Sequence, residues 1–170
     1  NRAASSKSGS ADLLEALGIN IDLTGSEVEQ TVHKIGIGFC FAPIFHSSMK
    51  YAAAARKELG VPTVFNILGP LANPAKPVAC AIGVARRELL PLMAQVLLQQ
   101  GKEGFVFRGD DGLDEVSLAT TTTVIQISNG NLTEEVFNPA ELGIASAPIS
   151  ELAGGDAKFN AQMTKQIFDG

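Results

Sequence analysis

Hydrophobic residues recur along the chain in two spacings, one typical of helices and one typical of buried strands. The helical spacing is clearest over residues 86–100, where it predicts a helix that ends at Gly101. Short apolar runs over residues 78–84 and 104–108 predict a buried strand on either side of that helix. Strands that alternate with helices of this length predict an α/β fold with a mostly parallel central sheet flanked by helices.

The remaining apolar positions predict the rest of the secondary structure. Four further helices are expected between capping residues and glycines, at residues 10–18, 26–34, 43–59 and 157–168. The apolar spacing of the second of these consists of Val28, Val32 and Ile35. Three further strands are expected at residues 37–42, 120–127 and 132–137, the last two joined as a hairpin by Asn129-Gly130. Prolines and a glycine over residues 65–74 predict an ordered loop that could contain one helical turn.

Length and composition limit the class of protein. The chain has 170 residues, which suits a single α/β domain over residues 1–170. A formal net charge of −5 without a long basic run argues against nonspecific binding to nucleic acid or to anionic membranes. Cys40 and Cys80 lie in apolar stretches, and two buried free thiols suit the reducing cytoplasm. The chain begins with Asn1 inside a motif-like stretch, so we interpret it as a fragment of a longer protein.

The first ten residues, NRAASSKSGS, form a small, polar and basic segment, and Ser10 is expected to cap the helix that follows it. Hydroxyl, amide and cationic groups next to a helix N-terminus could bind a phosphate, because the free N–H groups there favour an anion. The alternative is a solvated, serine-rich terminus. The residues alone support both interpretations equally.

Four carboxylates follow the strand predicted at residues 104–108, in the segment GDDGLDE. Ends of strands are where α/β proteins place their sites. The adjacent Asp114 and Glu115 suit magnesium, which takes one or two carboxylates and keeps its other positions for water and substrate phosphate. On the residues alone, an acidic surface turn is the favoured interpretation.

A stripe of basic side chains lies along one face of the helix predicted at residues 43–59, formed by His46, Lys50 and Arg56 or Lys57. Arg56 follows four alanines, and its planar guanidinium could hold a carboxylate with two hydrogen bonds. An exposed helix end is the simpler interpretation, and His46 is more commonly a capping or packing histidine than a catalytic one. No motif for a serine or cysteine nucleophile is present.

Three long segments of the chain resemble the anthranilate phosphoribosyltransferase family, in the same order and spacing. They are NRAASSKSGSADLLEALGI, FAPIFHSSMKYAAAARKELGVPTVFNILGPLANP and FRGDDGLDEVSL. The resemblance implies part of a catalytic domain of the nucleoside phosphorylase/phosphoribosyltransferase-like kind. The family's N-terminal helical domain, glycine-rich loop and C-terminal end have no counterpart in the chain. The activity implied is transfer of the phosphoribosyl group of phosphoribosyl pyrophosphate to anthranilate, a step of tryptophan biosynthesis.

The resemblance also implies roles for particular residues. Phosphoribosyl pyrophosphate would be bound by Asn1, Arg2, Ala3, Ala4, Ser5, Ser6 and Ser10. Anthranilate would contact Asn1, Arg56, His46, Gly69 and Pro70. Asp114 and Glu115 would be ligands of Mg²⁺, the one cofactor implied. No acid, base or nucleophile is implied, so catalysis would come from positioning and from the metal.

Further expectations concern the protein as a whole. The serine-lined loop and the acidic segment are expected to converge on one pyrophosphate–magnesium site. The intact enzyme is expected to be a cytoplasmic homodimer acting on small molecules, whereas the fragment alone would be inactive. Two alternatives are a pyrimidine nucleoside phosphorylase-like enzyme and a noncatalytic nucleic-acid-binding relative. A third is a folded fragment without a function of its own.

Overall fold

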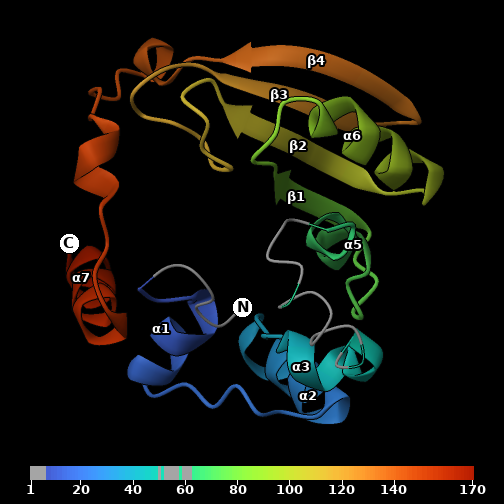
Figure 1. The fold of residues 1–170 in the computed structure, drawn as a ribbon, viewed down its shortest axis with the longest axis vertical. Helices are drawn as coiled ribbons and strands as arrows, with labels where there is room; N and C mark the ends of the chain where they lie inside the picture. Colours follow the sequence, from blue (N-terminus) through green and yellow to red (C-terminus); the bar gives the residue numbers. More distant parts are fainter. Residues whose placement is uncertain (1–6, 50, 52–57, 59–62) are drawn as a thin grey trace. The chain divides into compact units, whose positions relative to one another are not determined.

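The computed structural model describes residues 7–49, 51, 58 and 63–170 (Figure 1). The chain divides into two compact units, one formed by Asn1–Pro62 with Ala153–Gly170 and the other by Thr63–Leu152. No helix among the described residues is long and apolar enough to cross a membrane.

The unit Thr63–Leu152 is built on a four-stranded sheet in the order β1-β2-β3-β4. Its strands are β1 (Ala79–Gly83), β2 (Glu103–Gly109), β3 (Thr122–Ser128) and β4 (Asn131–Phe137). All four predicted strands of this unit are confirmed, and so is the α/β class. The sheet is mixed, however, rather than mostly parallel, because only β1 and β2 run in the same direction. A helical crossover joins β1 to β2, whereas β2 and β3 are joined by a loop without a helix and therefore pair antiparallel.

The hairpin β3–β4 turns at Asn129 and Gly130, as predicted. Their φ angles of 50° and 75° are both positive, as a type I′ turn requires, and asparagine and glycine adopt this conformation most readily. Two 3₁₀ turns follow the hairpin, η2 (Pro139–Leu142) and η3 (Ile149–Leu152).

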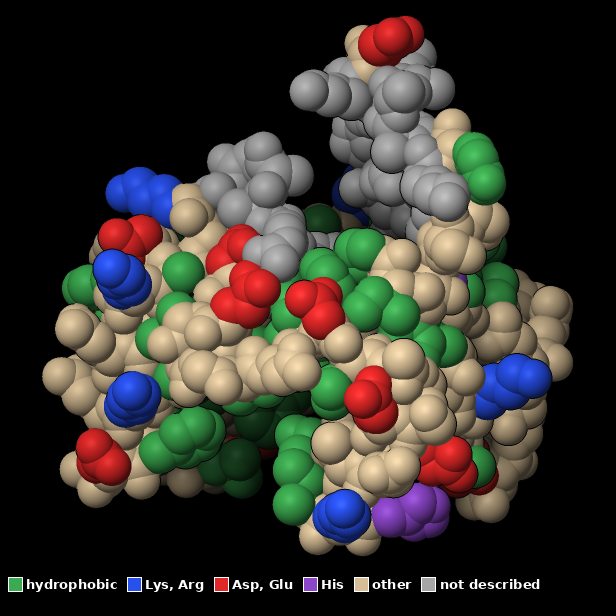
Figure 2. Space-filling model, turned by 90° about the horizontal axis from the view of Figure 1, so that it is seen from below, with side chains coloured by type: hydrophobic (Ala, Val, Ile, Leu, Met, Phe, Trp, Pro, Cys, Tyr) green, Lys and Arg blue, Asp and Glu red, His purple; other side chains and the backbone are tan. Residues whose placement is uncertain are grey.

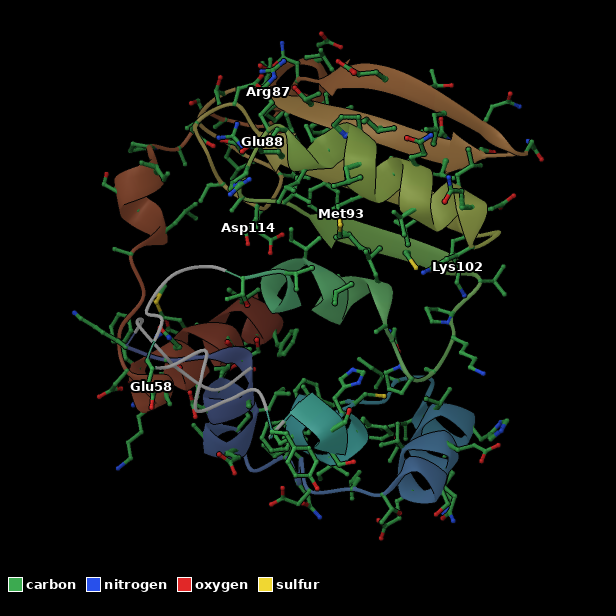
Figure 3. All side chains as sticks on the ribbon, turned by 45° about the vertical axis from the view of Figure 1, so that its right-hand side comes forward. Glu58, Arg87, Glu88, Met93, Lys102 and Asp114 are labelled. Atoms are coloured by element: carbon green, nitrogen blue, oxygen red, sulfur yellow. The ribbon has the colours of Figure 1, made fainter. Side chains whose placement is uncertain are left out.

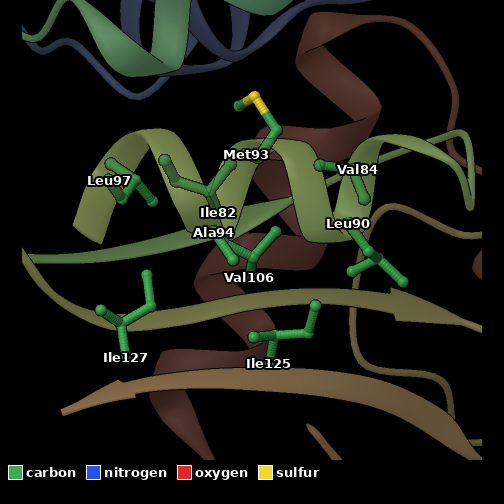
Figure 4. Packing of buried hydrophobic residues seen from close by; sticks show 9 residues of the cluster. All are labelled: Ile82, Val84, Leu90, Met93, Ala94, Leu97, Val106, Ile125 and Ile127. Carbon is green, nitrogen blue, oxygen red and sulfur yellow. The ribbon is translucent and has the colours of Figure 1, made fainter. Parts of the chain in front are cut away.

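Helix α6 (Leu89–Gln99) covers one face of the sheet and supplies the core of this unit (Figure 4). Its buried residues are Leu90, Met93, Ala94 and Leu97, which pack against Ile82, Val84, Val106, Ile125 and Ile127. The helix begins three residues later than predicted, because residues 86–88 form a turn in which the Leu89 N–H donates to the Arg86 carbonyl. This shared core fixes the positions of β1, β2 and β3, from which the connecting loops extend.

Helix α5 (Phe65–Leu71) replaces the ordered loop that the sequence predicts, so that prediction was wrong. Pro70 is the second-last residue of the helix, where it removes a single main-chain hydrogen bond. Ile67 and Leu71 pack against the core of the sheet, and this burial stabilises the short helix.

The second unit contains the helices α1 (Ser10–Ala16), α2 (Gly25–Ile35), α3 (Ala42–Phe45) and α7 (Ala157–Asp169), with the 3₁₀ turn η1 (Ser47–Met49). Helices α1 and α7 contact each other, and a small core forms from Ala11, Ile21 and Phe41. The predicted helices at residues 10–18, 26–34 and 157–168 are confirmed within two residues at their ends.

Two predictions for this unit were wrong. Residues 37–41 form no strand, because Phe41 and its stacked neighbour Phe39 pack as side chains against Ala11 and Ile21 while no described strand pairs with their main chain. The helix predicted from residue 43 is interrupted at His46, whose φ and ψ of −117° and 54° are not helical. Most of its remainder lies outside the described residues.

Helix α2 begins as its sequence predicts, but only part of its apolar face is covered. The Thr24 N–H donates to the Glu27 carboxylate at 2.8 Å, which forms a capping box. Val28 is buried, whereas Val32 and Ile35 are 47% and 71% exposed. On the face shown in Figure 2, hydrophobic side chains are likewise exposed among charged ones.

Candidate functional site

The acidic loop, residues 110–121, follows the carboxyl end of β2 and connects it to β3. Asp114 of this loop lies at the same end of the sheet as Arg87 and Glu88, which precede α6, whereas Lys102 lies at the opposite end (Figure 3). The loop therefore lies where the sequence predicts a site, beyond the carboxyl ends of the parallel strands.

Asp110 fastens the start of the loop to β3. Its carboxylate accepts hydrogen bonds from the hydroxyls of Thr121, at 2.5 Å, and Thr123, at 3.1 Å, and it faces Arg87 at 3.7 Å. The main-chain N–H of Asp110 also donates to the Thr121 carbonyl. The hydrogen bond from Thr121 is the main reason that the pKa of Asp110 is lowered.

Asp111 fastens the middle of the loop. Its two carboxylate oxygens accept from the Ser117 hydroxyl, at 2.5 Å, and from the Leu113 N–H, at 3.2 Å. Ser117 is fully buried, and its main-chain N–H donates to the Thr122 hydroxyl at 3.0 Å. The hydrogen bond from Ser117 is the largest cause of the lowered pKa of Asp111.

Asp114 and Glu115 differ from these two aspartates. Both are exposed, and neither side chain has a hydrogen bond or ion pair with any residue that the structure describes. Within the described residues, no three His, Cys, Asp or Glu side chains lie close enough together to hold a metal ion by themselves. Two adjacent, unengaged carboxylates suit magnesium, which needs only one or two of them when water and substrate phosphate supply the other ligands.

The main chain of Asp114 lies directly against Gly83, the last residue of β1. A Cβ atom at Gly83 would lie only 1.6 Å from the Asp114 carbonyl oxygen. Only glycine allows the loop and the strand to approach so closely. This contact sets how closely the main chain of Asp114 lies to the end of β1.

The Arg108 side chain links the end of β2 to the residues that follow β1. Its Nε donates to the Ala85 carbonyl at 3.2 Å, and its Nη1 donates to the Gly109 carbonyl at 3.1 Å. Sequence reasoning missed Arg108, and it missed that Asp110 and Asp111 serve the loop itself. Threonine and serine residues after an acidic run were the only available signal for the latter.

Ser10 is the first residue of α1 and not its N-cap, so the predicted capping role was wrong. Gly9 is the N-cap, because its carbonyl accepts the first helical hydrogen bond, from Leu13. The N–H of Gly9 donates in turn to the Asp12 carboxylate at 2.9 Å. Ser10 belongs to one unit and Asp114 to the other, so their expected convergence stays a prediction.

The remaining predicted residues are placed in part. His46 is half-buried and is the C-cap residue of α3, where its main-chain N–H donates to the Ala42 carbonyl. Gly69 and Pro70 belong to α5. Pro70 lines an open hollow of about 460 Å³ that also includes Cys80 and Lys102 but no residue of the acidic loop. Residues 1–6 and Arg56 lie outside the described residues.

Both cysteines are free thiols, as predicted, although they are half-buried rather than buried. Burial raises the pKa of the Cys40 thiol.

The mixed sheet, its covering helix and the acidic loop beyond the strand ends form an α/β domain of a kind found in solved phosphoribosyltransferases. Solved structures share this fold. Anthranilate phosphoribosyltransferase from Thermus thermophilus matches with a TM-score of 0.88 at 43% identity, over 96% of this chain and 48% of that one. The enzyme from Saccharomyces cerevisiae in complex with PRPP and Mg matches with a TM-score of 0.88 at 34% identity, over 96% and 45% of the two chains.

The sequence comparisons identify the family. The model of the glycosyl transferase family, a/b domain, matches residues 1–170, and the chain belongs to this family. Its full length is 52% identical to an anthranilate phosphoribosyltransferase of Rhodococcus jostii and 53% identical to one of Acidothermus cellulolyticus. The chain covers 47% and 48% of these two relatives, so it spans about half their length.

Proposed function

We propose that the protein carrying this chain is an anthranilate phosphoribosyltransferase. It transfers the phosphoribosyl group of 5-phosphoribosyl 1-pyrophosphate to anthranilate and releases pyrophosphate, in the second step of tryptophan biosynthesis from chorismate. The observation that carries this proposal is the identity of about half of all residues, over the whole chain, with enzymes of that name. Residues 1–170 are then proposed to form one part of a single catalytic domain, and the match of one family model to all of these residues supports this.

Asp114 and Glu115 are proposed to hold Mg²⁺, which would supply positive charge to balance the negative charge that develops on the departing pyrophosphate. Their exposure and their lack of other partners among the described residues support this role. The structure of the yeast relative in complex with PRPP and Mg supports the use of this metal.

The segment from Asn1 to Ser6 and Ser10 are proposed to bind the phosphates through hydroxyl and main-chain N–H groups. Arg56 is proposed to hold the anthranilate carboxylate in a two-pronged hydrogen bond, with Asn1, His46, Gly69 and Pro70 around the ring. A relative solved with 4-fluoroanthranilate supports an aromatic acid as the acceptor.

The reaction needs no dedicated general base, because the aromatic amine is already a neutral nucleophile. Positioning of the two substrates supplies much of the acceleration, on the order of 7–11 kcal/mol at best. We further propose that the intact enzyme is a cytoplasmic homodimer and that residues 1–170 alone are inactive.

The test uses a protein that carries this sequence at the full length of its relatives. Consumption of anthranilate is followed by its fluorescence, with phosphoribosyl pyrophosphate and Mg²⁺, beside phosphorolysis of thymidine and uridine. We expect turnover of anthranilate only. Phosphorolysis without anthranilate turnover would instead establish the nucleoside phosphorylase alternative, and binding of DNA that weakens with salt would favour the nucleic-acid-binding one.

A second test concerns the metal. Replacing Asp114 by Asn and Glu115 by Gln removes both charges at nearly constant volume. This double variant should lose most of its magnesium-dependent turnover. Turnover equal to that of the unaltered enzyme would exclude the two residues from the metal site.

A further inference from the structure

Asp111 holds both ends of the segment that carries Asp114 and Glu115. One carboxylate oxygen accepts from the Leu113 N–H, immediately before the pair, and the other accepts from the Ser117 hydroxyl, two residues after it. The segment between these two hydrogen bonds consists of Asp114, Glu115 and Val116, all of which are exposed. The Asp111 side chain therefore links the residues on either side of this short exposed segment.

The hydrogen bonds around Ser117 require a carboxylate at position 111. The Ser117 oxygen already accepts from the N–H groups of Ala119, at 3.0 Å, and Thr120, at 3.3 Å. Its own proton is therefore directed to Asp111, which must offer an acceptor there and a second acceptor to Leu113. An asparagine has only one carbonyl oxygen, so its amide N–H₂ would face either the Leu113 N–H or the crowded Ser117 oxygen.

The surroundings give Asp111 a rigid base. Ser117 is fully buried and its N–H is bound to the buried Thr122 hydroxyl at the start of β3. The Gly109 N–H donates to the Leu113 carbonyl at 2.9 Å, which closes the loop from the side of β2. Asp111 itself is exposed, but the buried hydrogen bond between Ser117 and Thr122 fixes the geometry of its partner.

From this arrangement we propose that Asp111 is a positioning residue for the metal ligands: it presents the carboxylates of Asp114 and Glu115 to magnesium in a fixed geometry without binding the metal itself. The inference rests on the proposed function, because it assumes that Asp114 and Glu115 bind magnesium. Loss of residues that orient metal ligands typically weakens metal affinity or activity about 10- to 100-fold.

Asp111→Asn is the test, with Asp110→Asn as its matched control. Both remove one charge from adjacent positions of the acidic loop, but the hydrogen bonds of Asp110 go to Thr121 and Thr123 and not to the segment 113–117. The measured quantities are the Mg²⁺ concentration for half-maximal turnover, the KM for anthranilate, and the affinity for Mn²⁺ in the presence of phosphoribosyl pyrophosphate alone, from the electron paramagnetic resonance signal of free Mn²⁺.

We expect Asp111→Asn to raise the half-maximal Mg²⁺ concentration and to weaken Mn²⁺ binding, each at least about 10-fold. Turnover should recover at high Mg²⁺ while the KM for anthranilate stays unchanged, and Asp110→Asn should change the metal dependence less than about threefold. A merely structural role would lower turnover without shifting the metal dependence.

Equal metal affinities in the two single variants, or a loss of turnover in Asp111→Asn that high Mg²⁺ does not restore, would overturn the proposal. If Asp111→Asn does not fold, Ser117→Cys weakens the same hydrogen bond while keeping the side-chain shape, and the same outcomes decide. Failure of the proposed metal site is recognised separately, since the double variant in which Asn replaces Asp114 and Gln replaces Glu115 would then keep its response to Mg²⁺.

Discussion

The contact between Gly83 and Asp114 allows a methyl group to be used as a probe of the acidic loop. In Gly83→Ala the new Cβ would lie 1.6 Å from the Asp114 carbonyl oxygen and 2.6 Å from its carbonyl carbon. Real Cβ atoms essentially never approach closer than 3.0 Å, so the loop and the strand must separate by at least about 1.4 Å. The atoms that must give way belong to the main chain and cannot rotate aside.

This separation should affect both the stability of the protein and its turnover. Overpacking a well-filled site costs about 1–3 kcal/mol of stability, so Gly83→Ala should unfold at a lower urea concentration than the unaltered protein. Displacement of catalytic groups by about 1 Å lowers turnover on the order of 100-fold, so activity should fall at temperatures where the variant is still folded.

The assay compares magnesium-dependent turnover and the urea midpoint of Gly83→Ala with those of Gly25→Ala. A Cβ at Gly25 would meet only a side-chain atom of Phe45, at an ordinary 3.7 Å, so this control should leave both quantities nearly unchanged. Unaltered turnover in folded Gly83→Ala would refute the reasoning, because the position of Asp114 would then not matter to catalysis.

Three further predictions address other parts of the chain. Arg56→Ala should raise the KM for anthranilate about 10-fold or more and leave the KM for phosphoribosyl pyrophosphate nearly unchanged. If the KM for anthranilate and kcat both stay unchanged, Arg56 does not belong to the acceptor site. Leu97→Ala, which empties a position only 1% exposed in the core, should lower the free energy of unfolding by about 2–5 kcal/mol, measured by urea denaturation; a loss under about 1 kcal/mol would contradict the packing. Hydrogen bonds lower the pKa values of Asp110 and Asp111 in the folded state. The stability that they contribute is therefore fully present above the unfolded pKa of about 4 and is lost as the pH falls through their lower folded values. Urea midpoints at pH 7 and pH 3 should differ less in a double Asn variant of these residues than in the unaltered protein, and an equal difference would contradict the linkage.

The sequence predicted best those elements whose signals are local. The hairpin at Asn129-Gly130 follows from the positive φ angles that these two residues tolerate, and α6 follows from a complete helical spacing of apolar residues. Helix α5 was missed because Gly69 and Pro70 are local breakers, whereas its stability comes from packing of Ile67 and Leu71 on a core formed by distant residues. For the same reason the apolar run over residues 37–42 predicts a strand that does not form, because Phe41 packs against the side chains of Ala11 and Ile21.

The candidate site shows the same division. Adjacent carboxylates at Asp114 and Glu115 could be singled out by residue type alone. Asp110 and Asp111 instead hold the loop in place, through hydrogen bonds from the hydroxyls of Ser117, Thr121 and Thr123. No local pattern in the sequence shows which acidic residues these hydroxyls bind. The close approach at Gly83 depends on three-dimensional neighbours 31 residues apart in sequence numbering and could not be read from a glycine alone.

Strand β1 is an edge strand of the described sheet, which has a practical consequence for work with these residues in isolation. It is five residues long, carries no charged side chain, and exposes Ala79 and Ala81. The other edge strand, β4, carries Glu134 and Glu135. An uncharged edge strand can pair with the edge strand of another copy, whereas charged side chains disfavour such pairing. Self-association of the isolated 170 residues should therefore begin at β1, and a lysine introduced at Ala79 or Ala81 should delay it.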